Sequence, residues 1–99
     1  IDTIKDHRDK TSLHLACSNG QLETIKQLME SCGADINAQS MDGETALHYA
    51  CAQGNLDVVE YLAGSHAADV NLQDNFGKVA LHDACTEGHV AIVKTLIES

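Results

Sequence analysis

The sequence predicts an all-α solenoid in which three helix pairs stack side by side and extended turns project from one edge. Shifting the sequence by 34 residues places Leu13-His14 on Leu47-His48 and on Leu81-His82. Within each unit, apolar residues recur with the 3.6-residue period of an amphipathic helix. Because so short a helix pair cannot bury its own apolar face, each pair must stack on its neighbours.

The first helix of each unit is expected at Ser12–Asn19, Ala46–Gln53 and Ala80–Glu87. Leu13, Ala16 and Cys17 fall at positions i, i+3 and i+4, which lie on one face of a helix. Thr11 and Thr45 are expected to cap the first two helices, because a threonine hydroxyl can accept hydrogen bonds from the free amides of the first turn. A glycine follows each of the three segments and is expected to end it in a left-handed conformation: Gly20, Gly54 and Gly88.

The second helices are expected to begin at Leu22, Leu56 and Val90, where the apolar period resumes. Polar links follow the first two of these helices, from Gly33 to Glu44 and from Ala67 to Lys78. Near the end of each link, in Asp42-Gly43 and Asn75-Phe76-Gly77, Gly43 and Gly77 suit the tip of a tight turn.

Together these segments resemble the ankyrin-repeat family over about Asp9 to Ser99, most clearly in residues 43–51, 54–59 and 68–71 and their equivalents at the 34-residue spacing. The resemblance implies one domain over residues 1–99, with repeats at about 9–41, 42–75 and 76–99. Since the chain lacks an initiator methionine and stops before a third link, we expect it to be part of a longer ankyrin-repeat protein.

Among the departures from the family pattern, two concern a helix cap and the repeat length. Val79 stands where a capping threonine is usual. Each unit is also one residue longer than the family's usual period, and we expect the extra residue near Cys32 and His66.

Composition limits the possible functions. The 99 residues include 6 Lys and Arg against 15 Asp and Glu, a formal net charge of −9. Nucleic acids and anionic lipid surfaces bind basic proteins, so neither is an expected partner. No apolar run approaches the roughly 20 residues of a membrane helix, and the first ten residues contain no signal-peptide core.

Three of the four cysteines, Cys17, Cys51 and Cys85, share the 34-residue spacing. Equivalent positions in a stack face the same direction, so we expect them to be small buried apolar residues rather than disulfide partners. Cys32 is expected to be more exposed, as a tolerated cysteine in a link. This use of cysteine favours a reducing compartment, the cytoplasm or the nucleus.

A histidine precedes each of these three cysteines by three residues, a spacing that a zinc site could use. A closed zinc site needs four converging ligands, however, so we expect no metal and no cofactor. The resemblance implies instead that His14, His48 and His82 hydrogen-bond groups at the turn before each helix. Catalysis by a Cys-His pair is disfavoured because a reactive thiolate needs exposure and positive surroundings.

Partner binding is the remaining interpretation. The resemblance implies a concave surface made of the turn tips and the exposed side of the first helices. Its tip residues would be Met41, Asp42, Glu44, Asn75, Phe76 and Lys78, and its helix residues Tyr49, Gln53, Asp83 and Glu87.

Two features of this surface have alternative explanations. Phe76, the only phenylalanine, lies in a turn, where it either packs on the neighbouring tip or binds a partner. Residues 42–75 contain six acidic residues and no Lys or Arg. That charge either favours a partner with a basic segment or serves solubility alone.

The sequence therefore predicts a module that binds a protein or peptide on its concave face, as a scaffold or adaptor without catalysis. The alternative is a regulatory ankyrin segment of a larger enzyme, channel or ubiquitin ligase.

Overall fold

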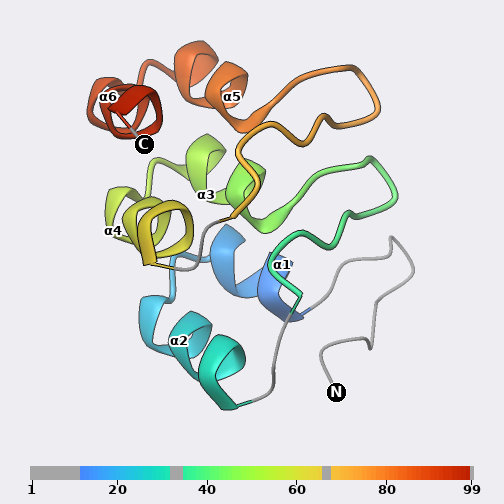
Figure 1. Cartoon of the computed structure of the whole chain (residues 1–99), viewed down its shortest axis with the longest axis vertical. Helices are drawn as coiled ribbons and strands as arrows, with labels where there is room; N and C mark the ends of the chain where they lie inside the picture. Colours follow the sequence, from blue (N-terminus) through green and yellow to red (C-terminus); the bar gives the residue numbers. More distant parts are fainter. Residues whose placement is uncertain (1–11, 32–34, 66–67, 99) are drawn as a thin grey trace.

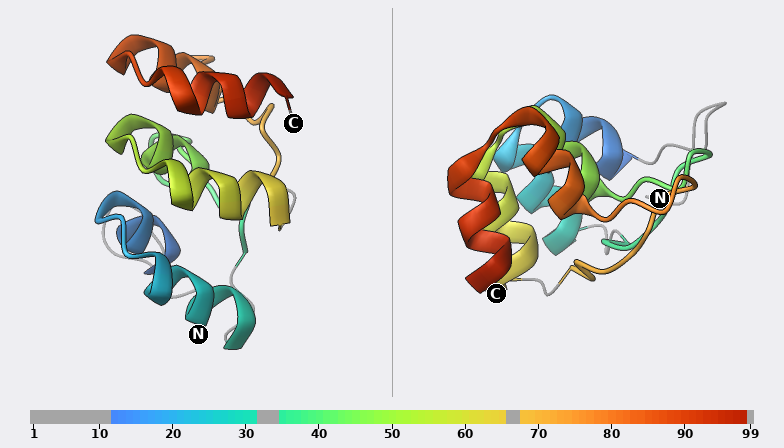
Figure 2. Two further views of the ribbon diagram at one scale, coloured as in Figure 1. Left: turned by 90° about the vertical axis from the view of Figure 1, so that its left-hand side faces the viewer. Right: turned by 90° about the horizontal axis from the view of Figure 1, so that it is seen from above.

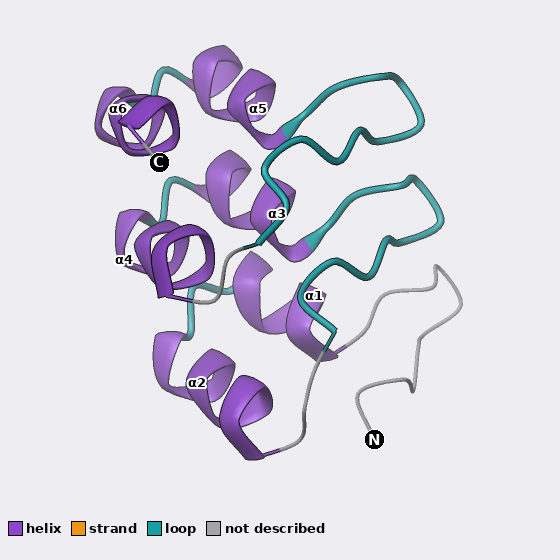
Figure 3. Ribbon diagram, viewed as in Figure 1, coloured by secondary structure: helices purple, strands orange, loops and turns teal. Residues whose placement is uncertain are grey.

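The computed structural model describes residues 12–31, 35–65 and 68–98, and within these ranges every regular element is a helix (Figure 3). In chain order the elements are α1 (Ser12–Ser18), α2 (Leu22–Ser31), α3 (Ala46–Gln53), α4 (Leu56–Val59), the π-helical turn η1 (Glu60–Ser65), α5 (Ala80–Glu87) and α6 (Val90–Glu98). The predicted all-helical fold and the positions of the first helices are confirmed.

The helices form two parallel layers. Figure 1 shows α1, α3 and α5 in one row and α2, α4 and α6 in the other, while the links extend from the side of the first row. Seen from the side in Figure 2, the three helix pairs lie one above the other. The molecule is therefore the stack that the 34-residue repeat predicts.

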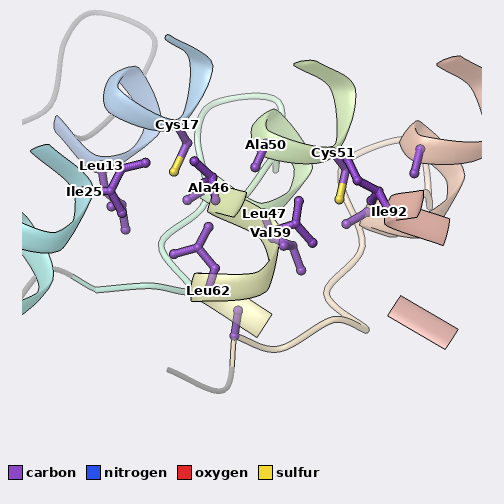
Figure 4. Packing of buried hydrophobic residues seen from close by; sticks show 14 of the residues in the cluster. Leu13, Cys17, Ile25, Ala46, Leu47, Ala50, Cys51, Val59, Leu62 and Ile92 are labelled. Atoms are coloured by element: carbon purple, nitrogen blue, oxygen red, sulfur yellow. The ribbon is translucent and has the colours of Figure 1, made fainter. Parts of the chain in front are cut away.

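A single apolar core runs through the stack (Figure 4). Small residues let the first helices approach closely, and Ala46, Ala50 and Cys51 of α3 are almost completely buried. Between the two layers, Leu47 of α3 packs with residues of the second helices, of which Val59 and Leu62 have no exposed surface. Because α3 has a neighbour on both sides, the middle unit holds much of this core.

The ends of α3 follow the sequence pattern. Thr45 has an extended backbone, and its hydroxyl accepts a hydrogen bond from the amide of His48 at 3.4 Å. At the other end Gly54 is left-handed, with φ of +78°. The left-handed conformation favours glycine here, and a Cβ at Gly54 would lie 2.7 Å from the His89 ring and displace it. Thr11, the other predicted cap, lies outside the described residues.

The second helix of the middle unit differs from the expected regular helix. After four residues of α4, the chain continues as the π-helical η1, in which each hydrogen bond spans one residue more than in an α-helix. The amide of Ala68 then donates to the carbonyl of Leu62 at 3.0 Å. Such a turn accommodates an additional residue while Leu62 stays in the core. Cys32 and His66, the predicted sites of the extra residue, lie outside the described residues.

The links are also joined across units. Asp35 and Asp69 each begin a small turn, in which the aspartate side chain accepts from the amide two residues later, at 3.0 Å in both cases. The side chain of Asn37 accepts from the amide of Asp69 at 2.9 Å. Each link therefore holds its own shape and also positions the following link.

Candidate partner-binding surface

The ends of the two links form projecting turns, which we call finger 1 (residues 40–44) and finger 2 (residues 74–78). In finger 2 the Asp74 carboxylate accepts from the amides of Phe76 at 2.8 Å and Lys78 at 2.9 Å. In finger 1 the hydroxyl of Ser40 accepts the two equivalent bonds, both at 3.3 Å. The same turn is thus fixed by a charged acceptor in one unit and by a neutral one in the other.

The environment of Asp74 favours its charged form. Burial alone would raise the pKa of this carboxyl, but the amides of Lys78 and Phe76 donate to it and the charges of His48 and Lys78 lie nearby. Together these contacts hold the pKa of Asp74 below its ordinary value. Ser40 and Asp74 were absent from the predicted site, although an Asp or Ser three residues before a turn glycine is the signal that could have found them.

Direct hydrogen bonds hold the fingers together. The Asn75 amide donates to the carbonyl of Asp42 at 2.9 Å, and its side chain donates to the carbonyl of Met41 at 2.8 Å. Below the tips, the Gln39 side chain donates to the carbonyls of Gln73 at 3.0 Å and Gly43 at 2.9 Å. The two tips are therefore fixed relative to each other.

The finger tips expose two large apolar side chains. Phe76 is 80% exposed and Met41 is 54% exposed. The hydrogen bond from the Asn75 side chain to the Met41 carbonyl joins the two fingers that carry these residues. Phe76 does not fold back onto the neighbouring tip, so the packing explanation for its position in the turn is wrong.

At the base of the fingers, Tyr49 of α3 is half-buried and meets the ring of His14 edge-on, with ring centres 5.5 Å apart. Burial raises the pKa of the Tyr49 phenol; the hydroxyl of Ser40 opposes this shift, and the charge of Glu44 adds to it. Tyr49, Ser40 and Glu44 therefore lie close enough to interact.

Asp83 of α5 occupies the position equivalent to Tyr49, one unit further along. Its side chain is only 12% exposed, with Oδ1 at 3.8 Å from the Lys78 ammonium, and its buried Oδ2 has no hydrogen-bond partner among residues 12–31, 35–65 and 68–98. Burial raises the pKa of Asp83; the charges of His48 and Lys78 oppose the shift, and those of Glu44 and Asp74 reinforce it. Asp83 is thus a carboxylate with incomplete compensation for its burial.

The structure groups some of the predicted residues and separates others. The tip residues Met41, Asp42, Asn75 and Phe76 lie together, and at the base of the fingers Glu44, Tyr49, Lys78 and Asp83 form a second group. Gln53 and Glu87 are exposed at the opposite ends of α3 and α5, away from the fingers.

His48 links two units. Its Nδ1 accepts from the amide of Thr45 at 3.0 Å, so Nε2 carries the hydrogen and donates to the carbonyl of Lys78 at 3.0 Å. The Nε2 of His14 likewise contacts the carbonyl of Ala38 at 2.8 Å. His82 accepts only from the amide of Val79, at 2.9 Å, and its ring is exposed. Val79, which has no hydroxyl, provides no side-chain cap.

The cysteines behave in two ways. Cys17 and Cys51 are fully buried, and burial raises the pKa of each thiol to about 12. The prediction that Cys85 is buried is wrong, because in the described chain no helix packs on that side of α5. Cys32 lies outside the described residues.

Among the residues that are described, no group of three His, Cys, Asp or Glu side chains converges on a possible metal position.

Residues 12–31, 35–65 and 68–98 enclose no pocket. None of the helices in these ranges has the length and hydrophobicity needed to cross a bilayer.

A stack of helix pairs with hydrogen-bonded fingers defines a helical repeat protein of the solenoid class. The family model for ankyrin repeats, in three copies, matches residues 13–99, so the chain belongs to the ankyrin-repeat family. No individual curated protein matches the sequence significantly. Ankyrin repeats are in general protein–protein interaction modules.

Proposed function

We propose that this chain binds another protein or a peptide on the concave surface formed by the two fingers and the exposed side of α3 and α5, as a scaffold or adaptor. The observation that carries the proposal is Phe76, an aromatic side chain that is 80% exposed on a turn held by several hydrogen bonds. Exposed aromatic residues on rigid supports are typical anchors of protein interfaces.

The charge of this surface supports a partner with a basic segment. The middle unit, residues 42–75, has six acidic residues and no Lys or Arg. Two acidic groups of the fingers, Glu44 and Asp74, are close enough to Asp83 to act on it electrostatically. A basic segment would be attracted to this field and would associate faster at low ionic strength.

The cysteine pattern supports a cytoplasmic or nuclear location, because two thiols are buried as apolar residues without forming a disulfide. Binding would take place without a chemical reaction at these residues. In a longer protein, the same surface could bind another part of the parent chain.

The proposal is tested by affinity capture from a reduced cell lysate with quantitative mass spectrometry. The test variant is Phe76→Ala with Glu44→Ala, which removes one apolar and one acidic side chain from the surface. The matched control, Ile97→Ala with Glu98→Ala, removes the same chemistry from α6. We expect the test variant to lose specific partners that the control retains, with both melting temperatures near that of the unmodified chain. Equal capture by all three proteins would contradict the proposal.

A further inference from the structure

The finger tips present an apolar surface that is already ordered before binding. Phe76 and Met41 are both more than half exposed, yet the turn that carries Phe76 is closed by the Asp74 carboxylate. Asn75 bonds this turn to the neighbouring finger through the carbonyls of Met41 and Asp42. A partner that covers these side chains therefore gains apolar contact with little loss of conformational entropy.

A different kind of contact is available at the base of the fingers. Asp83 is mostly buried, and among the described residues the one charged neighbour within ion-pair distance is Lys78, at 3.8 Å from Oδ1. No donor from the described part of the chain reaches its second oxygen. A buried carboxylate without its hydrogen bonds is costly, so a stronger cationic donor at this position would stabilise it.

The surroundings of Asp83 suit a planar cation. The charge of Glu44 acts on both Asp83 and Tyr49, and these two residues occupy equivalent positions on the neighbouring helices α5 and α3. A guanidinium there could donate to the carboxylates and contact the Tyr49 ring. The Lys78 ammonium is half exposed and held only loosely, so it can move away.

We propose that the finger tips and Asp83 form one two-part surface, which binds a protein segment carrying an apolar side chain and an arginine. The apolar side chain covers Phe76 and Met41, and the arginine replaces Lys78 beside Asp83. This inference rests on the proposed function and specifies the chemistry of the partner.

Charge argues for such a segment over a second copy of this chain. The formal net charge is −9, so two copies repel each other, whereas an arginine-containing segment is attracted. Arginine is favoured over lysine because its rigid fork of five N–H donors can bond to more than one acceptor at once.

The experiment uses two probe peptides, acetyl-(Arg-Leu)4-amide and acetyl-(Arg-Ser)4-amide, which carry equal charge and differ in apolar side chains. Their affinities for the whole chain are measured by isothermal titration calorimetry at low ionic strength. We expect the leucine peptide to bind about tenfold more tightly, because each leucine that is covered contributes transfer free energy.

The variant Phe76→Ala should abolish most of this preference for leucine without weakening the serine peptide. Its control is Ile97→Ala, which truncates an apolar side chain on α6 that is 69% exposed. That control should leave the preference unchanged.

The acidic part is tested with Asp83→Asn, which keeps the shape of the side chain and removes its charge. We expect about a fivefold to tenfold loss of affinity for both peptides. Glu98→Gln, with the same change of charge on α6, should cause less than about a twofold loss. Lys78→Ala should tighten binding more than Lys94→Ala, because only Lys78 occupies the position beside Asp83.

The outcomes separate this inference from the proposed function. If the peptides bind but Asp83→Asn matches Glu98→Gln, or Phe76→Ala matches Ile97→Ala, the two-part surface is wrong while a basic partner remains supported. If neither peptide binds even at low ionic strength, the proposal of a basic partner fails as well, and this inference fails with it.

Discussion

The middle and last helix pairs have nearly the same residues at their key positions but different surroundings. Cys51 is fully buried, whereas Cys85, at the equivalent position 34 residues later, is exposed. Gly54 lies under the ring of His89, while nothing lies within 4 Å of a Cβ added at Gly88. The residues of one unit therefore do not determine their own burial, which depends on whether another unit packs against them.

The histidines show the same difference at the level of hydrogen bonds. His48 bonds through both ring nitrogens, one to Thr45 and the other to the backbone of finger 2. His82 makes only the bond within its own turn. The Ala-Leu-His segment shared by both units thus links successive units in the middle of the described stack, but makes only a local bond in its last unit.

The largest difference between the two units should appear in thiol chemistry. In a Cys32→Ser variant, iodoacetamide should alkylate Cys85 rapidly, while Cys17 and Cys51 react only after the chain opens. Their reaction should be about a thousandfold slower, as expected for an opening free energy near 4 kcal/mol. The measurement is mass spectrometry of timed samples, with denatured protein as the control. Similar rates for all three thiols in the folded protein would show that the core between α1, α3 and α5 is open.

Truncating the equivalent leucines should give the next largest difference. Leu47 is buried and Leu81 is half-buried. Leu47→Ala should reduce the free energy of unfolding by about 2–5 kcal/mol. Leu81→Ala should reduce it by less than half of the loss measured for Leu47→Ala. Urea unfolding followed by circular dichroism measures both. Equal losses would mean that the last unit is packed as completely as the middle one.

The histidine pair should differ by a smaller amount. His48→Ala leaves the Thr45 amide without its partner and removes one of the two hydrogen bonds to the Lys78 carbonyl, the other coming from the Asp74 amide, and should reduce the free energy of unfolding by about 1–3 kcal/mol. His82→Ala affects one partly exposed bond and should cost less than about 1 kcal/mol. The same urea titration measures both losses of unfolding free energy. A larger loss for His82→Ala than for His48→Ala would contradict this prediction.

The smallest effect compares the two fingers. The pKa of Asp74 is lowered in the folded chain, so its charge stabilises the fold above the unfolded-state pKa near 4, and this contribution is lost as the pH falls through the folded-state pKa. Asp74→Ser copies Ser40 and should cost about 1 kcal/mol at pH 7 and less at pH 3. Unfolding in urea at both pH values checks the sign. An equal loss at both would show that the charge of Asp74 is unimportant.

Much of the fold follows from the sequence, because a helix is encoded by residues close together in the chain. The 34-residue spacing and the apolar period predicted Ala46–Gln53 and Ala80–Glu87 at the residues where α3 and α5 lie. The sequence also predicted Gly43 and Gly77 at turn tips, and their φ values of +80° and +79° are left-handed, as such turns require.

The remaining features depend on contacts between units. Nothing in residues 60–65 alone indicates a π-helical turn, and the bonds of Asn75 and Gln39 to the neighbouring finger join residues about one full repeat apart. The exposure of Cys85 could not be predicted from its repeat position, because its burial would require a neighbour beyond α5. The burial of Asp83 Oδ2 without a hydrogen-bond partner among the described residues likewise results from packing among several elements.

The bonds between successive links have a direction. Asn37 accepts from Asp69 and His48 donates to the carbonyl of Lys78, so each unit uses one set of groups toward the next and a different set toward the previous one. Contacts of this kind are head-to-tail, and repeating them generates an open rod rather than a closed two-fold pair. The molecule is consequently polar along its length, and its two ends offer chemically distinct surfaces.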